Sequence, residues 1–324
     1  MEKIQVIGID IAKLKFDVCA LFQGKTRRKI FANNISGFKE LTTWTSDLDL
    51  ENPHFCMEAT GCYSQGLAEF LHDKNFKVSV CNPLQIKRFR ESKLVRQKTD
   101  SSDSEVIARF CLQNTPLFWR PTPLENKELR EVNGTINNLK DERNRLTNRL
   151  EKTYENKVVK SFIKREIRFI EKNLELLQKE AHKIINSSSK FKKNYEKLIA
   201  IKGVGERTAI TILADMPDVS TFKNSKQYAA FAGVTPSHYE SGSSVRGKSH
   251  ISRIGSGKIR KSLYMAAIVV KNHNHYFDTF TKGLASKNKP PKVIIVAVMR
   301  KLLTIIFGML KNNQHFDEKL AFSC

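Results

Sequence analysis

The chain has 324 residues, enough for two or three domains, and carries a formal net charge of +23 with a pI near 9.8. Such an excess of positive charge attracts polyanions, so we expect nucleic acid as the partner, with an anionic membrane surface as the weaker alternative. The six cysteines form no C-x-x-C pair, which argues against a disulfide framework or a zinc site and favours a reduced, cytoplasmic protein.

The first predicted element is a buried strand, Gln5-Val6-Ile7-Gly8-Ile9-Asp10, which ends in a carboxylate. Strands over residues 16–21 and 29–33 follow closely enough to pair with it as an antiparallel meander. A helix over residues 36–47 then leads to a second short apolar run, which ends in Glu58. A carboxylate at a buried strand end needs a cation, a helix N-terminus or a ligand, although Asp10 could also be a turn or capping residue.

The sheet continues after Glu58 with a helix from about Tyr63, a strand over residues 77–81 and a basic helix over residues 83–94. The order of three strands, helix, strand, helix, strand and helix is typical of a ribonuclease H-like α/β fold. The basic helix supplies three candidate nucleic-acid contacts, Lys87, Arg88 and Arg90.

Asp100 and Asp103 lie three residues apart at the start of the next predicted helix, so they face the same way. Taken alone, they would simply complement the helix dipole. Together with Asp10 and Glu58, however, they can converge at one edge of the sheet, where grouped carboxylates repel one another unless divalent cations lie between them. We therefore expect a site for Mg²⁺, with two ions held by these four residues.

Residues 116–124 form a proline-rich linker, and residues 125–190 are predicted to be helical. A seam with alternating steps of four and three, typical of a coiled coil, comprises Ile163, Ile167, Ile170, Leu174, Leu177, Ala181 and Ile184. The polar stretch over residues 151–160 either turns the chain back as a hairpin or continues the helix. The seam therefore joins two chains or packs a helical pair within one chain.

Residues 191–324 carry 22 Lys and Arg against 8 Asp and Glu. Within them, residues 198–210 match a helix-hairpin-helix element with the turn Lys202-Gly203-Val204-Gly205. Glycines there can bring backbone N–H groups close to a phosphate, although such a turn also occurs as plain packing. The apolar segment over residues 293–310 is interrupted by Arg300 and Lys301, which favours a buried helix over a membrane span.

Residues 237–261 are rich in Gly, Ser and basic residues. Composition alone favours a solvated loop, yet such a loop can also wrap a polyanion, and its hydroxyls can donate to phosphate or act as nucleophiles. The candidate phosphate contacts in this tract are Arg246, Lys248, Lys258 and Arg260.

Taken together, the segments resemble the DEDD transposases of bacterial insertion sequences, which are related to Piv-type site-specific invertases and include bridge-RNA-guided recombinases. The resemblance covers nearly the whole chain. Five motifs carry it, in order: Gly8-Ile9-Asp10-Ile11-Ala12-Lys13, Met57-Glu58-Ala59-Thr60-Gly61, Lys98-Thr99-Asp100-Ser101-Ser102-Asp103, Gly203-Val204-Gly205, and Phe231-Ala232-Gly233-Val234-Thr235-Pro236 leading into Ser241-Gly242.

This resemblance implies a transposase or recombinase with a RuvC-like domain over residues 1–115, a coiled-coil middle and a C-terminal transposase domain over residues 191–324. It implies donor and target double-stranded DNA, a non-coding bridge RNA and a homodimer or higher homo-oligomer as partners. It places the catalytic, metal-binding carboxylates and the nucleophile on Asp10, Glu58, Asp100, Asp103 and Ser241, with Ser243 and Ser244 as neighbouring alternatives to the serine.

Three other function classes remain open. The Gly8-Ile9-Asp10-Ile11 motif also resembles the first phosphate motif of actin-like sugar kinases, but the second phosphate loop of those enzymes is missing. A Holliday-junction resolvase or another metal-dependent nuclease would use four carboxylates with water as the nucleophile. An architectural DNA-binding protein would use the carboxylates only as helix and turn caps.

Overall fold

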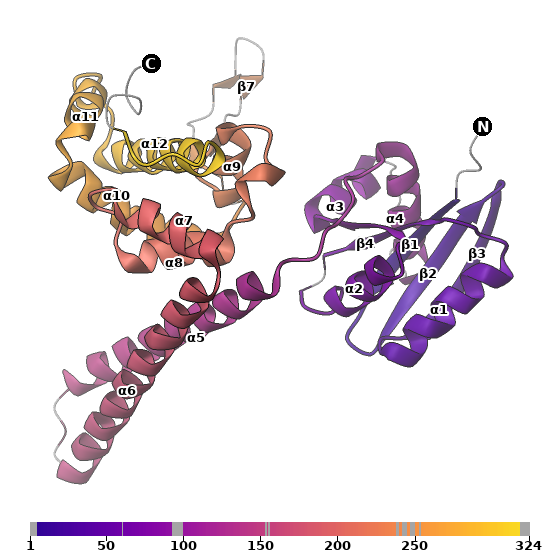
Figure 1. Ribbon diagram of the computed structural model, residues 1–324, viewed down its shortest axis with the longest axis horizontal. Helices are drawn as coiled ribbons and strands as arrows, with labels where there is room; N and C mark the ends of the chain where they lie inside the picture. The colour runs from indigo at the N-terminus through magenta and orange to yellow at the C-terminus, as the bar shows by residue number, and fades with distance from the viewer. Residues whose placement is uncertain are drawn as a thin grey trace. The chain divides into compact units, whose positions relative to one another are not determined.

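The computed structural model describes residues 5–59, 61–92, 100–152, 154, 156–237, 240–241, 245–246, 250–252 and 254–317, and gives only the backbone for residues 100–102, 237, 240–241 and 245–246. The chain divides into two compact units, Met1–Pro121 and Thr122–Cys324 (Figure 1). The first unit contains a mixed α/β sheet, and the second is mostly helical.

The first unit is built on a five-stranded sheet with the order β3-β2-β1-β4-β5. Strands β1, β2 and β3 are antiparallel, which confirms the predicted meander, and β4 and β5 continue the sheet parallel to β1. The strands are β1 Gln5–Ile11, β2 Lys15–Phe22, β3 Lys25–Ala32, β4 His54–Glu58 and β5 Lys77–Cys81.

Helices cover both faces of this sheet. Helices α1 (Ile35–Asp47) and α2 (Gln65–Asp73) pack on the face that carries Ile7, Ile9 and Phe55. Helices α3 (Pro83–Ser92) and α4 (Asp100–Asn114) pack on the opposite face, which carries Val6, Cys56 and Cys81. The predicted alternation of three strands, helix, strand, helix, strand and helix is thus confirmed, with α4 added after it.

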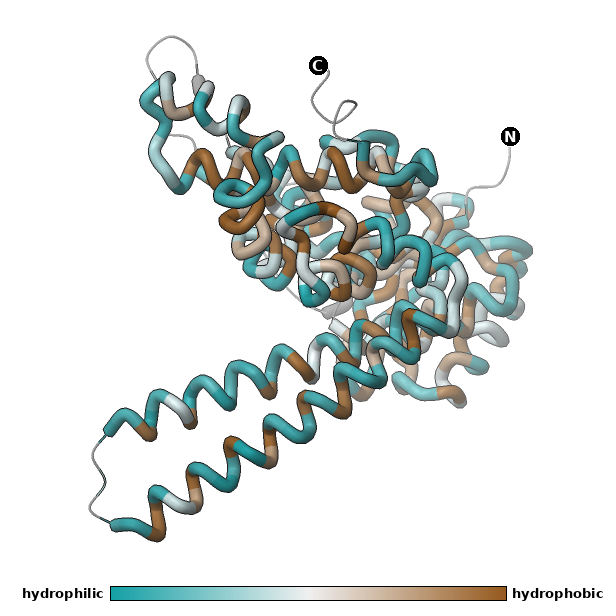
Figure 2. The backbone as a smooth tube through the Cα atoms, turned by 60° about the vertical axis from the view of Figure 1, so that its left-hand side comes forward, coloured by the Kyte–Doolittle hydropathy of each residue, from teal (hydrophilic) through white to brown (hydrophobic). Residues whose placement is uncertain are grey.

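The second unit begins with two long helices, α5 (Leu124–Leu150) and α6 (Lys157–Ser187), which form a hairpin (Figure 2). The side chain of Asn156 caps α6 by accepting a hydrogen bond from the Val158 N–H, at 2.9 Å. Of the predicted seam, Ile170 and Leu174 pack with Ile136 of α5 in a small core. The two helices therefore form a hairpin and are not one continuous helix. This part of the seam packs within one chain.

The other helices of this unit surround one large apolar core. They are α7 (Ser189–Ile199), α8 (Glu206–Asp215), α9 (Ser225–Ala232), α10 (Gly257–His273), α11 (Asp278–Ala285) and α12 (Pro291–Lys311), with the short 3₁₀ helices η1 (Val219–Thr221) and η2 (His275–Phe277). Helix α12 is long and apolar enough to span a membrane by composition, but Val298, Leu302 and Ile306 are fully buried in this core. Its packing is that of a core helix, as the sequence predicts.

The glycine- and serine-rich tract between α9 and α10 contains short strands where the composition predicts a loop. Pro236–Ser237 (β6) pairs with His250–Ile251 (β9), and Glu240–Ser241 (β7) pairs with Val245–Arg246 (β8). Ser241 therefore lies on a two-residue strand, paired with Val245.

Candidate active site

Two of the predicted carboxylates lie at the ends of neighbouring parallel strands. Ile9 of β1 is level with Met57 of β4, so Asp10 and Glu58 are the next residues along each strand. Side chains alternate between the two faces of a sheet, and Ile9 and Met57 both lie in the core under α1 and α2. Asp10 and Glu58 therefore lie on the opposite face, beneath α4, and both are half-buried.

Helix α4 brings its own start to the same edge of the sheet. Gly8 lies directly under α4, because a Cβ added there would come within 2.2 Å of the Ser104 carbonyl oxygen. The far end of the helix lies at the beginning of β4, where the Cys111 Sγ is 3.4 Å from Nδ1 of His54. Since α4 runs opposite to β1 and β4, its first turn, with Asp103, lies towards the strand ends that carry the carboxylates.

The sequence analysis missed a further carboxylate on this face, Asp17. It lies directly opposite Asp10 in the antiparallel β1–β2 ladder, so the two side chains share a face. Asp17 is buried, and its Oδ2 is 3.4 Å from Nζ of Lys15. The alternation of Phe16, Asp17 and Val18 could have indicated this position from the sequence. Phe16 and Val18 belong to the core on the other face of the sheet, so Asp17 between them points to the face of Asp10.

Arginine side chains pair with two acidic residues of α4, Asp103 and Glu105. Arg90 Nη2 contacts Asp103 Oδ1 at 2.7 Å, with both side chains mostly buried. Arg28 and Arg109 both pair with Glu105. Burial opposes ionisation of Glu105, but the hydrogen bonds from Arg109 and Arg28 outweigh burial and hold its pKa below the usual value. Arg90, predicted as a nucleic-acid contact, thus positions a candidate catalytic carboxylate.

The donor set suits a hard divalent cation, because Asp10, Asp17, Glu58 and Asp103 offer only carboxylate oxygens. Among the residues with described side chains, no three His, Cys, Asp or Glu are grouped closely enough to hold one ion. The side chain of Asp100, the remaining predicted ligand, lies outside that set. The residues therefore suit Mg²⁺ by the chemistry of their oxygens, and not by a close cluster among the described side chains.

The predicted helix-hairpin-helix turn is present between α7 and α8, and its two glycines have different surroundings. Gly203 has a φ of +103°, and a Cβ there would lie 2.6 Å from Cγ2 of Val270 in α10. Asn274 also donates a hydrogen bond to the Lys202 carbonyl, at 3.2 Å. A Cβ on Gly205, the N-cap of α8, would meet nothing within 4 Å. Gly203 is therefore required by packing, whereas Gly205 leaves the start of α8 open.

Lys258 and Arg260, the two predicted contacts of the C-terminal tract with described side chains, have different surroundings. Lys258 is exposed in the first turn of α10, as a phosphate contact requires. Arg260 instead packs on the backbone, because a Cβ on Gly233 would lie 2.2 Å from its Nη1 atom. That Nη1 is buried and has no hydrogen-bond partner within the part of the chain that the structure describes. Three further predictions fall outside the described atoms, namely the side chains of Ser241 and Arg246 and the whole of Lys248.

The remaining candidates lie on the surface of the first unit. Lys87 and Arg88 are exposed on α3, and Lys87 Nζ is 4.0 Å from Oε1 of Glu91.

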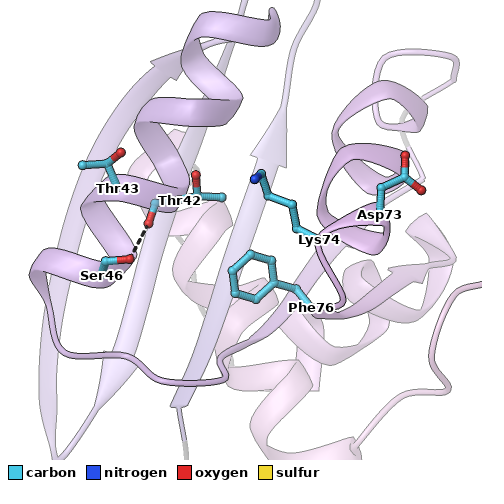
Figure 3. A pocket seen from close by; sticks show the side chains of 6 residues that line it. All are labelled: Thr42, Thr43, Ser46, Asp73, Lys74 and Phe76. Carbon is cyan, nitrogen blue, oxygen red and sulfur yellow. Dashed lines mark hydrogen bonds between the residues drawn. The ribbon is translucent and has the colours of Figure 1, made fainter.

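A surface hollow of about 560 Å³ between α1 and the end of α2 is open to solvent (Figure 3). It lies on the α1 and α2 side of the sheet, away from the face of Asp10 and Glu58, and is lined by Thr42, Thr43, Ser46, Asp73, Lys74 and Phe76.

Comparison with known proteins shows the family of this chain. A transposase model of the IS110 DEDD type matches residues 7–156, and the model of the transposase IS116/IS110/IS902 family matches residues 195–282. The pilin gene-inverting protein of Moraxella bovis is 32% identical over 97% of this chain and 98% of its own length. The transposase for insertion sequence element IS1111A of Coxiella burnetii is 22% identical over 98% of this chain and 92% of its own length. The chain therefore belongs to the IS110 family of transposases and DNA-inverting proteins.

Proposed function

We propose that the protein is a site-specific DNA recombinase that cuts and rejoins strands with a ribonuclease H-like carboxylate site. The observation that carries the proposal is that Asp10 and Glu58 lie on one face at one edge of the sheet, with the first turn of α4 towards the same edge. The β3-β2-β1-β4-β5 order, with three antiparallel strands followed by two parallel ones, supports the ribonuclease H-like assignment. The Moraxella and Coxiella relatives support recombination over simple nucleolysis.

In this proposal Asp10, Glu58, Asp100 and Asp103 hold two Mg²⁺ ions, and Asp17 lies next to them. Bound Mg²⁺ supplies charge neutralisation at the attacking and leaving oxygens of the phosphodiester. Arg90 positions Asp103 through its 2.7 Å contact and limits repulsion among the carboxylates. Glu105 stays ionised between Arg28 and Arg109, and its ion pair with Arg28 joins α4 to β3.

The proposed nucleophile is Ser241. Its hydroxyl oxygen attacks the phosphorus of a DNA strand, the bond to the 3′ oxygen breaks, and the proton is transferred to that oxygen. The strand is then linked to the protein through phosphoserine, and the free 3′-hydroxyl reseals on the partner duplex without net hydrolysis. Ser241 belongs to the helical unit and the carboxylates to the sheet unit, so the proposed chemistry requires residues of both units, supplied by one chain or by two.

The proposed partners are donor and target duplex DNA, a non-coding bridge RNA that selects both, and at least one further copy of the chain. The net charge of +23 supports binding to nucleic-acid backbones without reading their sequence. The exposed Gly205 at the start of α8 and the exposed Lys258 on α10 supply phosphate contacts of this kind. We place the protein in the cytoplasm.

The metal site is tested with Asp10→Asn and a matched control, Asp73→Asn, which lies on the opposite side of the sheet at the hollow of Figure 3. Strand cleavage is measured on family insertion-site DNA with Mg²⁺ or with a chelator, and DNA binding is measured separately. Asp10→Asn and chelation should abolish cleavage and spare binding, whereas Asp73→Asn should cleave normally. Near-normal cleavage by Asp10→Asn would remove the carboxylate site from the proposal.

The nucleophile is tested by trapping the covalent protein–DNA adduct in Ser241→Ala, with the exposed Ser286→Ala as control. Ser241→Ala should bind DNA without forming the adduct, and its mixture with Asp10→Asn should regain partial activity if two subunits share one site. An adduct that persists in Ser241→Ala would move the nucleophile to Ser243 or Ser244. Cleavage without any adduct in the unmodified protein would instead indicate a water-dependent nuclease of the resolvase type.

A further inference from the structure

Beneath α4, along β4 and β5, lies a cluster of three cysteines, one histidine and one serine that the proposed recombination chemistry does not use. Cys56 of β4, Cys81 of β5 and Cys111 of α4 are buried, with exposed fractions of 0%, 4% and 2%. The Sγ atoms of Cys56 and Cys81 are 3.4 Å apart, and Cys111 belongs to the same buried cluster. His54 contacts Cys111 through Nδ1 at 3.4 Å and contacts Ser79 through Nε2 at 2.8 Å.

The hydrogen bonds of this cluster assign the protons on His54. The Ser79 hydroxyl lies 2.9 Å from the Leu117 carbonyl oxygen and 3.2 Å from that of Pro116, and carbonyl oxygens only accept. The single Ser79 proton is thus used, so Ser79 must accept from Nε2–H of His54. The Nδ1 atom is then left to take the proton of Cys111. A nucleophile, a base and a third group that orients the base are the components of an activated thiol.

We propose that Cys111 is a peroxide-reactive thiol and that Cys56 converts its oxidised form into a disulfide between α4 and β4. The hydrogen bonds from Cys56 and His54 lower the pKa of Cys111 to about 6, which agrees with this assignment. Cys19 instead hydrogen-bonds to Arg28, whose effect on its pKa is smaller than that of burial. It is also fully buried, and burial together with nearby Glu105 raises its pKa, so it is a comparison thiol in the same unit.

The chemistry needs a hydroperoxide as the oxidant. The Cys111 thiolate attacks one peroxide oxygen, the O–O bond breaks, and the departing hydroxide takes the proton from His54 and leaves as water. The Cys56 sulfur then attacks the sulfenic sulfur of Cys111, the S–O bond breaks, and a second water leaves with the Cys56 proton. Two thiols and one hydrogen peroxide thus become one disulfide and two waters.

The position of the cluster gives this disulfide a structural effect. Cys56 precedes Glu58 by two residues on the same face of β4, and Cys111 lies on the helix that carries Asp103. A bond between them would fix the last turn of α4 on β4, on the sheet face that also carries Glu58. The oxidation itself depends only on the thiols and His54, so it can be tested without any assumption about recombination.

The first experiment uses the full chain with Cys62→Ser and Cys324→Ser, which removes the exposed Cys62 and the cysteine that lies beyond the described residues. The reduced protein is exposed to hydrogen peroxide at pH 7, quenched with alkylating agent in denaturant, and analysed by peptide mass spectrometry. Because a larger thiolate fraction speeds the attack, Cys111 should be lost about tenfold or more faster than Cys19, with a Cys56–Cys111 disulfide as the product. Equal rates at the two cysteines would overturn the proposal.

The second experiment replaces the base and the resolving thiol in turn. His54→Gln should slow the loss of Cys111 to within about twofold of Cys19, whereas His72→Gln, on α2, should leave the rate unchanged. Cys56→Ser should let the sulfenic form of Cys111 accumulate, detected as a dimedone adduct after unfolding. A His54→Gln protein that retains its tryptophan-detected melting temperature and still oxidises Cys111 at the normal rate would refute the role of His54.

Discussion

Replacing Gly8 with alanine should separate α4 from β1, because the new Cβ would lie 2.2 Å from the Ser104 carbonyl oxygen and 2.3 Å from the Ala108 nitrogen. Both neighbours are backbone atoms, so no side-chain rotation relieves the contact. Overpacking of this kind costs about 3 kcal/mol at the upper end of its usual range. For a unit of this size, that cost corresponds to a fall of about 10 °C in melting temperature.

The two tryptophans make this measurement specific to the sheet unit. Trp44 and Trp119 are the chain's two tryptophans, and both lie within Met1–Pro121. Thermal unfolding followed by tryptophan-selective fluorescence therefore reports on that unit. The matched control is Gly134→Ala in α5, where an added Cβ meets nothing within 4 Å. It should stabilise the helical unit by about 0.5–1 kcal/mol and leave the tryptophan transition unchanged.

Gly8→Ala should also lose metal-dependent cleavage while the protein still binds DNA, since the start of α4 would shift away from Asp10 and Glu58. An unchanged tryptophan transition in Gly8→Ala would refute the close packing of α4 on β1. The inference that Asp103 lies at the same edge of the sheet as Asp10 and Glu58 would then be wrong as well.

Three further predictions concern other parts of the chain. Gly203→Ala should lower the melting temperature of the helical unit, measured by circular dichroism. Gly205→Ala should leave that temperature unchanged and weaken DNA binding. Equal effects of the two variants on the melting temperature would contradict the different roles of the two glycines. The pKa of Glu105 is lowered by folding, so its ionised form stabilises the sheet unit above about pH 4.5, and that contribution is lost as the pH falls through the folded value. Tryptophan-detected melting should therefore depend less on pH in Glu105→Gln, and an unchanged pH profile would contradict this. Ile170→Lys should make the α5–α6 hairpin sensitive to protease, whereas the exposed Phe169→Lys should not, and equal sensitivity would place Ile170 outside the seam.

The sheet could be predicted from the sequence because its signals are local. Short apolar runs ending in Asp10 and Glu58 indicate buried strands, and their order along the chain favours one topology. Asp17 was missed because its importance depends on the β1–β2 register, which places it opposite Asp10. A register of this kind is set by strand pairing across the turn and not by any single residue.

Long-range pairs were the other part that the sequence could not predict. Arg90 is basic on a basic helix, and only the packing of α3 against α4 shows that it pairs with Asp103. Cys111 is buried, and its contact with His54 joins residues 57 positions apart, which no local pattern indicates. Arg260 likewise packs on Gly233, although its local composition indicates a solvated phosphate contact.

The α5–α6 hairpin has a mechanical consequence. Its base is fixed in the large helical core by Leu129, Ala181 and Ile184, whereas Ile136, Ile170 and Leu174 form a separate core farther along. Helix α5 has 27 residues and is therefore about 40 Å long, slightly more than one turn of B-DNA. Such a hairpin acts as a lever: a rotation of about 10° at the core moves its tip by about 7 Å, the rise of two base pairs along a strand.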